Sequence, residues 1–115
     1  MQTRLVHVRA NVGNLVKAIR WYCDYLGFEL DSVWPRETPI YADFKFQEGA
    51  VFAIAVAEAV PSGARFNFAI KDVDAFWEQL KDRVEIVEQL SDTPYGTRRF
   101  TIRDLYGNEL GFSRG

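Results

Sequence analysis

The fold is decided by two strand-like stretches, His7–Val12 (HVRANV) and Arg65–Ile70 (RFNFAI), which come into register at an offset of 58 residues. The same offset pairs two helix-capping residues and two later glycines: Asn14 with Asp72, and Gly49 with Gly107. Self-similarity at one fixed offset is the signature of a repeated structural unit. We therefore expect two copies of one unit, related by a pseudo-twofold axis, with a site where the copies meet.

The first copy, residues 1–60, has the pattern of one helix and four strands. Asn14 is a good N-cap residue, and Leu15, Ala18 and Tyr22 follow at helical spacing until Gly27, which is placed to end the helix. Alternating or continuous apolar runs predict strands over residues 5–12, 28–34, 40–47 and 50–57.

The second copy, residues 61–115, follows the punctuation Pro61-Ser62-Gly63 and has the same order. Asp72 is expected to cap a helix, residues 91–96 to form a polar loop, and residues 65–70, 84–90, 98–103 and 108–113 to form strands. The predicted fold class is α+β, a single domain of two βαβββ modules in which the apolar face of the strands packs under the helices.

Composition limits the classes of function. The chain has 115 residues, of which 48% are hydrophobic, so one domain can bury a full core. A net charge of −2 argues against a nucleic-acid or membrane-surface partner, and no apolar run reaches the roughly 18 residues of a membrane span. The sequence enters a strand pattern at once, so no signal peptide is expected. Cys23 is the one cysteine, so we expect no disulfide, a cytoplasmic location and a structural role for this thiol.

Alternation of side chains divides each strand into an apolar set and a second set on the opposite face. In the first copy Val6, Val8, Ala10 and Val12 form the apolar set of the first strand. The opposite face combines polar residues with small ones: His7, Arg9, Asn11, Arg65, Asn67, Arg99 and Glu109, together with Ala53, Ala55 and Gly111. Small residues lower the floor of a site and polar ones orient a ligand, although a half-exposed sheet also presents a polar face to water.

Three tryptophans and two arginines are candidates for ligand contacts. Trp34, at a strand end before Pro35, is the best placed to stack on a flat ligand, whereas Trp77 lies on a helix core stripe and Trp21 flanks one. Arg65 and Arg99 have the fork geometry that binds carboxylates and phosphates. The alternative is that they form ordinary salt bridges with Asp43 or Glu109.

Three stretches resemble the glyoxalase / bleomycin resistance protein / extradiol dioxygenase superfamily, also called vicinal oxygen chelate proteins. They are Arg20–Leu30 (RWYCDYLGFEL), Ile70–Ala75 (IKDVDA) and Pro94–Asn108, which closes with RDLYGN. Leu105 stands where proline is usual. The resemblance implies that the strands of the two modules curl into a cup, with the helices on its outer face, and that short members form homodimers.

The resemblance also implies a test for a metal. Metal-dependent members place His or Glu ligands on the first and last strand of each module, and these positions are His7, Ala53, Arg65 and Gly111 here. A catalytic metal needs about three protein ligands, and only His7 is of the right type. Glu109 lies two residues before one ligand position. We therefore expect no metal and no other cofactor.

The leading hypothesis is a metal-free, homodimeric protein that binds or sequesters a small organic ligand, anionic or aromatic, in the cup. The predicted ligand-binding residues are His7, Arg9, Asn11, Trp34, Arg65, Asn67, Arg99 and Glu109. The alternative is an enzyme, a glyoxalase-type lyase or isomerase or a dioxygenase, in which His7 and Glu109 are the catalytic acid and base. A third reading is a regulatory module with an empty cup.

Overall fold

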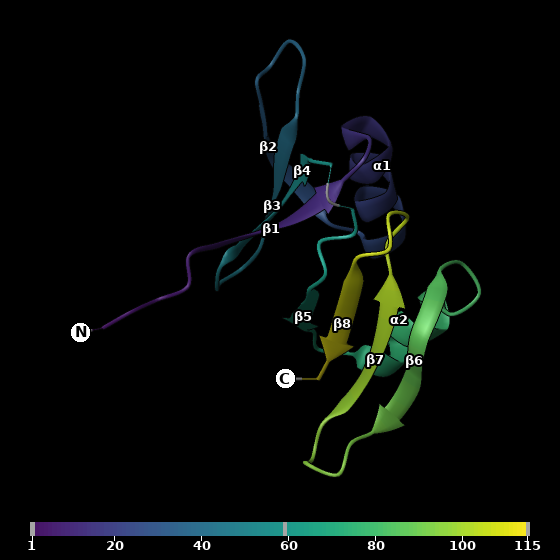
Figure 1. Cartoon of the computed structure of the whole chain (residues 1–115). Helices are drawn as coiled ribbons and strands as arrows, with labels where there is room; N and C mark the ends of the chain where they lie inside the picture. The colour runs from purple at the N-terminus through teal and green to yellow at the C-terminus, as the bar shows by residue number, and fades with distance from the viewer. Residues whose placement is uncertain (1, 59, 115) are drawn as a thin grey trace. The chain divides into compact units, whose positions relative to one another are not determined.

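The structure is a computed structural model, and it describes residues 2–58 and 60–114. Its contacts divide the chain into two compact units, Met1–Ser62 and Gly63–Gly115, here called unit 1 and unit 2. Each unit contains four strands and one helix, and Figure 1 labels them in chain order. No helix in the described part of the chain is long and apolar enough to cross a membrane.

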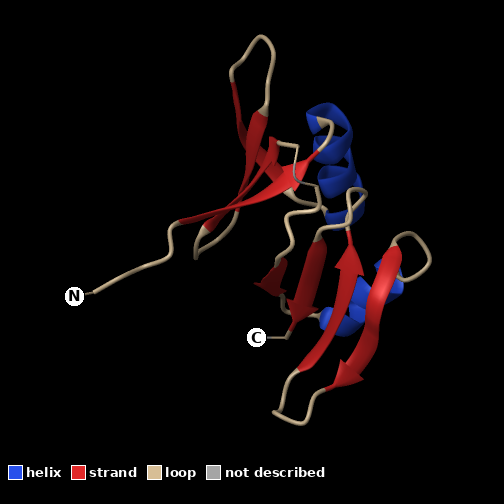
Figure 2. Ribbon diagram, in the orientation of Figure 1, coloured by secondary structure: helices blue, strands red, loops and turns tan. Residues whose placement is uncertain are grey.

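Unit 1 is a mixed sheet with a helix on one face (Figure 2). Its elements are β1 (His7–Val12), α1 (Leu15–Leu26), β2 (Glu29–Trp34), β3 (Tyr41–Lys45) and β4 (Val51–Val56). The strand order is β1-β4-β3-β2. The first pair, β1 with β4, is parallel, and the other two pairs are antiparallel.

Unit 2 repeats this plan. Its elements are β5 (Arg65–Ala69), α2 (Val73–Leu80), β6 (Glu85–Asp92), β7 (Arg98–Arg103) and β8 (Glu109–Ser113). The strand order is β5-β8-β7-β6, again with one parallel pair followed by two antiparallel pairs. The α+β class and the duplication predicted from the offset are confirmed.

The predicted helix caps are confirmed at atomic level. The Lys17 N–H donates to Asn14 Oδ1 over 3.0 Å, and the Ala75 N–H donates to Asp72 Oδ1 over 3.0 Å. Gly27 has φ +70°, a left-handed conformation that glycine adopts without penalty, and its N–H reaches the carbonyl of Cys23. Local capping chemistry therefore sets where both helices begin and where α1 ends.

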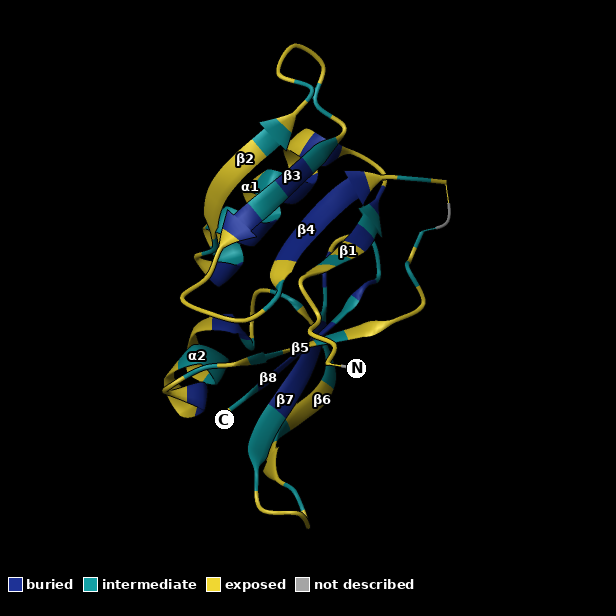
Figure 3. Ribbon diagram, turned by 90° about the vertical axis from the view of Figure 1, so that its left-hand side faces the viewer, coloured by how far each residue is buried: buried dark blue, intermediate teal, exposed yellow. Residues whose placement is uncertain are grey.

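The core of each unit is aromatic and lies between sheet and helix. In unit 1 Tyr22 of α1 packs on Phe44 and Phe52, with ring centroids 5.5 and 5.7 Å away. In unit 2 Phe100 and Phe112 are buried under α2, and Trp77 packs on Phe100 at 5.3 Å. Figure 3 shows the consequence for the inner strands, since β4 is buried along most of its length and β7 along half of it.

Several predicted strand boundaries are wrong by one or two residues. Val6 is not part of the buried set of the first strand, because β1 begins at His7 and the Val6 side chain is 56% exposed. The loop predicted to begin at Ser91 starts later, because Ser91 and Asp92 pair with Arg99 and Arg98 and continue the β6–β7 ladder. The polar side chains of Ser91 and Asp92 predicted a loop, but backbone pairing extends the hairpin through these residues.

The turn before β8 is held by a buried carboxylate. Asp104 is 5% exposed, and its Oδ1 accepts hydrogen bonds from the N–H groups of Tyr106 (2.8 Å) and Asn108 (2.9 Å). Its Oδ2 accepts from the Asn108 side-chain amide over 2.9 Å. These hydrogen bonds between Asp104 and the turn therefore position the start of β8.

We expect Asp104→Ala to lower the free energy of unfolding by about 2 kcal/mol, because it leaves buried donors of the turn without acceptors. Urea denaturation followed by far-UV circular dichroism measures this loss. Asp82→Ala, at an exposed aspartate of the same unit, is the matched control and should change stability little. Equal stability of the two variants would contradict the role of the turn.

Candidate ligand-binding site

Two rows of side chains cross the unit 1 sheet on one face, from β1 to β2. The first row is Asn11, Ala55, Tyr41 and Trp34, and the second is Arg9, Ala53, Asp43 and Ser32. Neighbouring strands lie about 4.8 Å apart, so the β1 and β3 members of a row are about 10 Å apart. Both alanines between them are buried and form a low floor.

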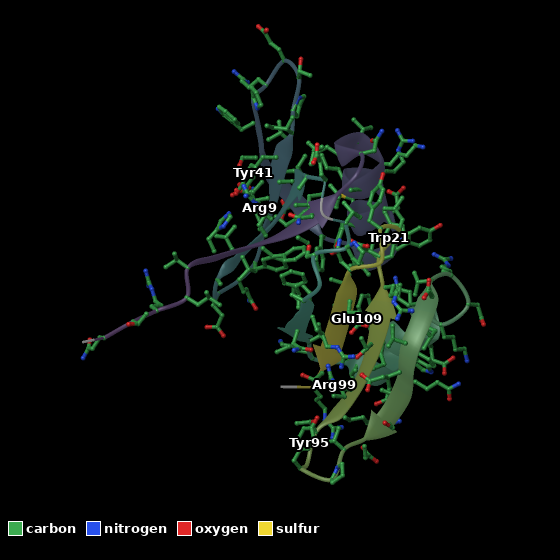
Figure 4. The ribbon with its side chains drawn as sticks, viewed as in Figure 1. Arg9, Trp21, Tyr41, Tyr95, Arg99 and Glu109 are labelled. Carbon is green, nitrogen blue, oxygen red and sulfur yellow. The ribbon has the colours of Figure 1, made fainter. Side chains whose placement is uncertain are left out.

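A pocket of about 350 Å³ lies on this face of unit 1. Its walls combine aromatic, aliphatic and polar residues, namely Arg9, Asn11, Trp34, Ile40, Tyr41, Ala55, Val56 and Ala57. The Trp34 side chain is 64% exposed, so a large aromatic surface faces solvent. Figure 4 labels Arg9 and Tyr41 on this part of unit 1, and both line the pocket.

Beside the pocket runs a chain of hydrogen bonds that begins at His7. The Nε2 atom of His7 lies 2.8 Å from the Tyr41 hydroxyl, which donates to Asp43 Oδ2 over 2.9 Å. Asp43 Oδ1 accepts from both the N–H (3.0 Å) and the hydroxyl (2.7 Å) of Ser32. Burial, together with the bond to Asp43 and its negative charge, raises the pKa of Tyr41 to about 12. The phenol therefore keeps its proton.

Arg9 differs from the other arginines on the strands. Among the described residues, Arg65, Arg98, Arg99 and Arg103 each lie within 4.0 Å of a carboxylate, whereas Arg9 takes part in no ion pair. The positive charge of Arg9 is thus uncompensated and lies at the wall of the pocket. This arrangement suits an anionic group on a ligand.

The corresponding face of unit 2 is filled by its own ion pairs. Arg65 reaches Glu88 Oε1 over 2.8 Å and Glu109 Oε1 over 2.9 Å, so two carboxylates hold one guanidinium. The Arg99 Nη2 donates to Asn67 Oδ1 over 2.7 Å, and its Nη1 lies 3.7 Å from Glu88. Salt bridging of Arg65 with Glu109, the alternative to ligand binding, is what the structure contains. Figure 4 labels Arg99 and Glu109 on this part of unit 2.

Both faces contain a hydrogen-bonded pair of a hydroxyl and a carboxylate, and the two groups lie on opposite strands of the hairpin in the two units. In unit 1 the carboxylate is Asp43 on β3 and its hydroxyl partner is Ser32 on β2. In unit 2 the carboxylate is Glu88 on β6, and the hydroxyl of Thr101 on β7 donates to it over 2.7 Å. Each pair directly follows a register shift in its hairpin, so the pairs occupy equivalent places.

The residues at the metal-ligand positions implied by the family do not fit a metal. No cluster of three or more His, Cys, Asp or Glu side chains forms a metal site in the described ranges 2–58 and 60–114. At Gly111 a Cβ atom would lie 2.2 Å from Asn67 Oδ1 and 2.3 Å from Arg99 Nη2, so a ligand side chain there would displace both side chains. Arg65 adds a positive charge at a second position, and His7 Nε2 is engaged by Tyr41.

The predicted site residues fall into two groups. Those of unit 1, Arg9, Asn11 and Trp34, line one pocket, and His7 joins them through Tyr41. Those of unit 2, Arg65, Asn67, Arg99 and Glu109, belong to one ion-pair network.

Sequence reasoning missed several members of both faces: Ser32, Ile40, Tyr41, Asp43, Glu88 and Thr101. The alternation of residues 40–47 places Ala42 and Phe44 on the core face, so it also places Tyr41 and Asp43 on the pocket face. That signal was available for β3. The bulges of β2 and β6 interrupt the alternation, so Ser32 and Glu88 had no such signal.

The Glu88 carboxylate provides a test of the unit 2 network. The hydrogen bond from Thr101 and the charges of Arg65 and Arg99 hold the pKa of Glu88 below its usual value. We expect Thr101→Val to raise the pKa of Glu88 toward the ordinary value of about 4.3, because the largest cause is removed. NMR titration of the side-chain carboxyl in both proteins measures the change, with Thr38→Val in unit 1 as the control.

The sign of the pH effect on stability follows from this depressed pKa. Ionised Glu88 stabilises unit 2 at pH values above the ordinary glutamate pKa, and this stabilisation is lost as the pH falls through the lowered folded value. In Thr101→Val this stabilisation should be smaller, and its loss should be complete at a higher pH. An unchanged Glu88 titration in that variant would show that the hydroxyl does not hold the carboxylate.

Comparisons with known proteins agree with this geometry. The family model described as Glyoxalase/Bleomycin resistance protein/Dioxygenase superfamily matches residues 4–112. A comparison with curated proteins found no significant match.

Solved structures with the same fold include TioX from Micromonospora sp. ML1, which is 24% identical with a TM-score of 0.78, with 98% of each chain covered. TnmS3, an antibiotic binding protein from Streptomyces sp. CB03234, is 22% identical with a TM-score of 0.80, covering 96% of this chain and 94% of its own. A lactoylglutathione lyase from Agrobacterium tumefaciens is 20% identical with a TM-score of 0.75, covering 97% and 93%. At these identities the similarity shows the fold, and the match of the family model over nearly the whole sequence shows that the chain belongs to the glyoxalase/bleomycin resistance protein/dioxygenase superfamily.

Proposed function

We propose that this protein binds a small organic molecule without a metal, and that the ligand occupies the pocket on the unit 1 sheet. The observation that carries the proposal is the pairing of the exposed Trp34 ring with the uncompensated Arg9 around a pocket of about 350 Å³. Ligand sites of this size are usually apolar with a few polar groups that orient the ligand. The alanine floor and the polar groups of Arg9, Asn11 and Tyr41 fit that description.

The metal-free part of the proposal is supported by the side chains at the four family ligand positions. Ala53 and Gly111 supply no donor, and Arg65 is a cation that two carboxylates already hold. Binding of an organic ligand by Arg9 and Trp34 needs no metal, because an ion pair and aromatic contact supply the attraction.

The fold similarity to TnmS3, described as an antibiotic binding protein, supports the same class of function. The alternative is an enzyme, a lyase, isomerase or dioxygenase with His7 and Glu109 as acid and base. Glu109 is paired with Arg65 and lies 3.7 Å from Arg103, which disfavours a role as a free base. The binding proposal accounts for more of the observed contacts.

We also propose that the protein works as a homodimer in the cytoplasm. Leu5 and Val6 precede the edge strand β1 and are 68% and 56% exposed. An exposed edge with apolar residues is a surface that proteins normally cover. A second copy of the chain is the partner that the family resemblance suggests.

Ligand binding at the pocket predicts saturable quenching of tryptophan fluorescence by aromatic compounds. We expect at least one of 2-naphthoate, 2-naphthamide and 2-naphthylmethylammonium to quench, and Trp34→Ala to weaken its affinity about tenfold or more through loss of the stacking surface. Isothermal calorimetry measures the affinities. Prior treatment with a chelator should leave them unchanged.

Trp21→Phe, which removes a tryptophan of α1 outside the pocket, is the matched control and should bind like the wild type. Two outcomes would overturn the proposal. One is the absence of saturable binding for all three charge types, and the other is stoichiometric binding of Ni²⁺, Zn²⁺, Mn²⁺ or Fe²⁺ that is lost in His7→Ala.

The homodimer predicts twice the chain mass of 13.2 kDa in sedimentation equilibrium at micromolar concentration. Replacing Leu5 and Val6 together by serine should shift the equilibrium toward the monomer, since the apolar area beside β1 is lost. A wild-type monomer throughout this concentration range would contradict the dimer.

A further inference from the structure

The unit 1 pocket carries enough chemistry to define the class of its ligand. Resting on the proposed function, we infer that it selects an aromatic acid whose ring system also carries a hydrogen-bond donor, such as a hydroxyl group. Three features of unit 1 lead to this class: a cation, an acceptor and a flat apolar wall.

The cation is Arg9. Its guanidinium has no carboxylate partner among the described residues, whereas Arg65 and Arg99 in unit 2 are held by Glu88 and Glu109. Guanidinium groups form their strongest hydrogen bonds with carboxylates, often in a two-pronged geometry. An acid group on the ligand supplies the partner that the described residues do not.

The acceptor is the Tyr41 hydroxyl oxygen, and the hydrogen-bond chain decides its role. Asp43 accepts two hydrogen bonds from Ser32 and a third from Tyr41, as an ionised carboxylate does. The one hydrogen of the Tyr41 hydroxyl therefore points at Asp43. The contact with His7 over 2.8 Å then uses the hydrogen on His7 Nε2, which assigns the tautomer of this histidine.

Tyr41 consequently cannot donate to a ligand. Its oxygen donates its one hydrogen to Asp43 and accepts one from His7, so its remaining lone pair is the acceptor that it presents to the pocket that it lines. A half-buried acceptor that meets an ether or a methyl group instead of a donor loses a hydrogen bond that water would have given it. The pocket thus favours a ligand with an O–H or N–H group at this point.

The flat wall joins these two polar groups. Trp34 and Tyr41 are paired across β2 and β3, and Ala55 lies beside Tyr41 on β4. The Trp34 ring is exposed, and the alanine leaves room above the sheet for a planar ring system. Arg9 and Tyr41 line the same pocket, which places the acid and the donor on different parts of one rigid aromatic body (Figure 4).

The test compares three matched compounds by isothermal calorimetry with the wild-type protein. They are 6-hydroxy-2-naphthoate, which has acid and donor, 6-methoxy-2-naphthoate, which lacks the donor, and 6-hydroxy-2-naphthamide, which lacks the charge. We expect the hydroxy acid to bind about fivefold more tightly than the methoxy acid, the difference usual for a neutral hydrogen bond. It should bind about tenfold or more tightly than the amide, the difference usual for a charged hydrogen bond.

Two variants assign each preference to its residue. Tyr41→Phe should bind the hydroxy and methoxy acids equally, and Arg9→Gln should bind the hydroxy acid and the amide equally. Tyr25→Phe and Arg20→Gln, both on α1 and outside the pocket, are the matched controls and should keep the wild-type order. The ligand series in the wild type decides the proposal even if a variant does not fold.

The outcomes separate this inference from the proposed function. If the methoxy acid or the amide binds as tightly as the hydroxy acid, the ligand class is wrong while small-molecule binding stands. If none of the three binds but a naphthyl cation does, the ligand class is again wrong. If no aromatic compound binds at all, the proposed function fails together with it.

Discussion

In each unit a carboxylate accepts a hydrogen bond from a hydroxyl on the neighbouring strand, directly after a bulge. These pairs, Ser32 with Asp43 and Thr101 with Glu88, orient the polar face of both sheets. A bulge re-aims the side chains that follow it, and the hydroxyl then fixes the carboxylate in one position. In unit 1 the carboxylate of Asp43 accepts a hydrogen bond from the Tyr41 hydroxyl and so orients it. In unit 2 the carboxylate of Glu88 forms ion pairs with Arg65 and Arg99.

The duplicated halves have diverged at the residues that these carboxylates meet. His7 in unit 1 corresponds to Arg65 in unit 2, and Tyr41 corresponds to Arg99 at the same offset of 58 residues. The rings of His7 and Tyr41 in unit 1 extend one hydrogen-bond chain, and Arg9 has no ion-pair partner among the described residues. In unit 2 the cations Arg65 and Arg99 form ion pairs with Glu88 and Glu109, which compensate their charge.

Much of the fold was predictable from the sequence, because local chemistry and tertiary packing agree there. Asn14, Gly27 and Asp72 cap the helices as their side chains and backbone freedom dictate. The site was less predictable. Strand alternation identified Arg9, Asn11 and Trp34, but Glu88, one of the two partners of Arg65, lies on β6 beyond a bulge, where alternation carries no information. Whether an arginine is free or paired depends on contacts between residues distant in sequence, and periodicity does not encode those contacts.

Two equivalent positions of the repeat, Gly111 and Ala53, use their space in different ways. At Gly111 the Asn67–Arg99 hydrogen bond occupies the volume that a larger side chain would need. At Ala53, the equivalent position in unit 1, a buried methyl group leaves the sheet low between Arg9 and Asp43. One position is thus closed by polar side chains and its mate is open. The open one lies in the row of residues beside the pocket, so the asymmetry of the repeat determines which half has room for a ligand.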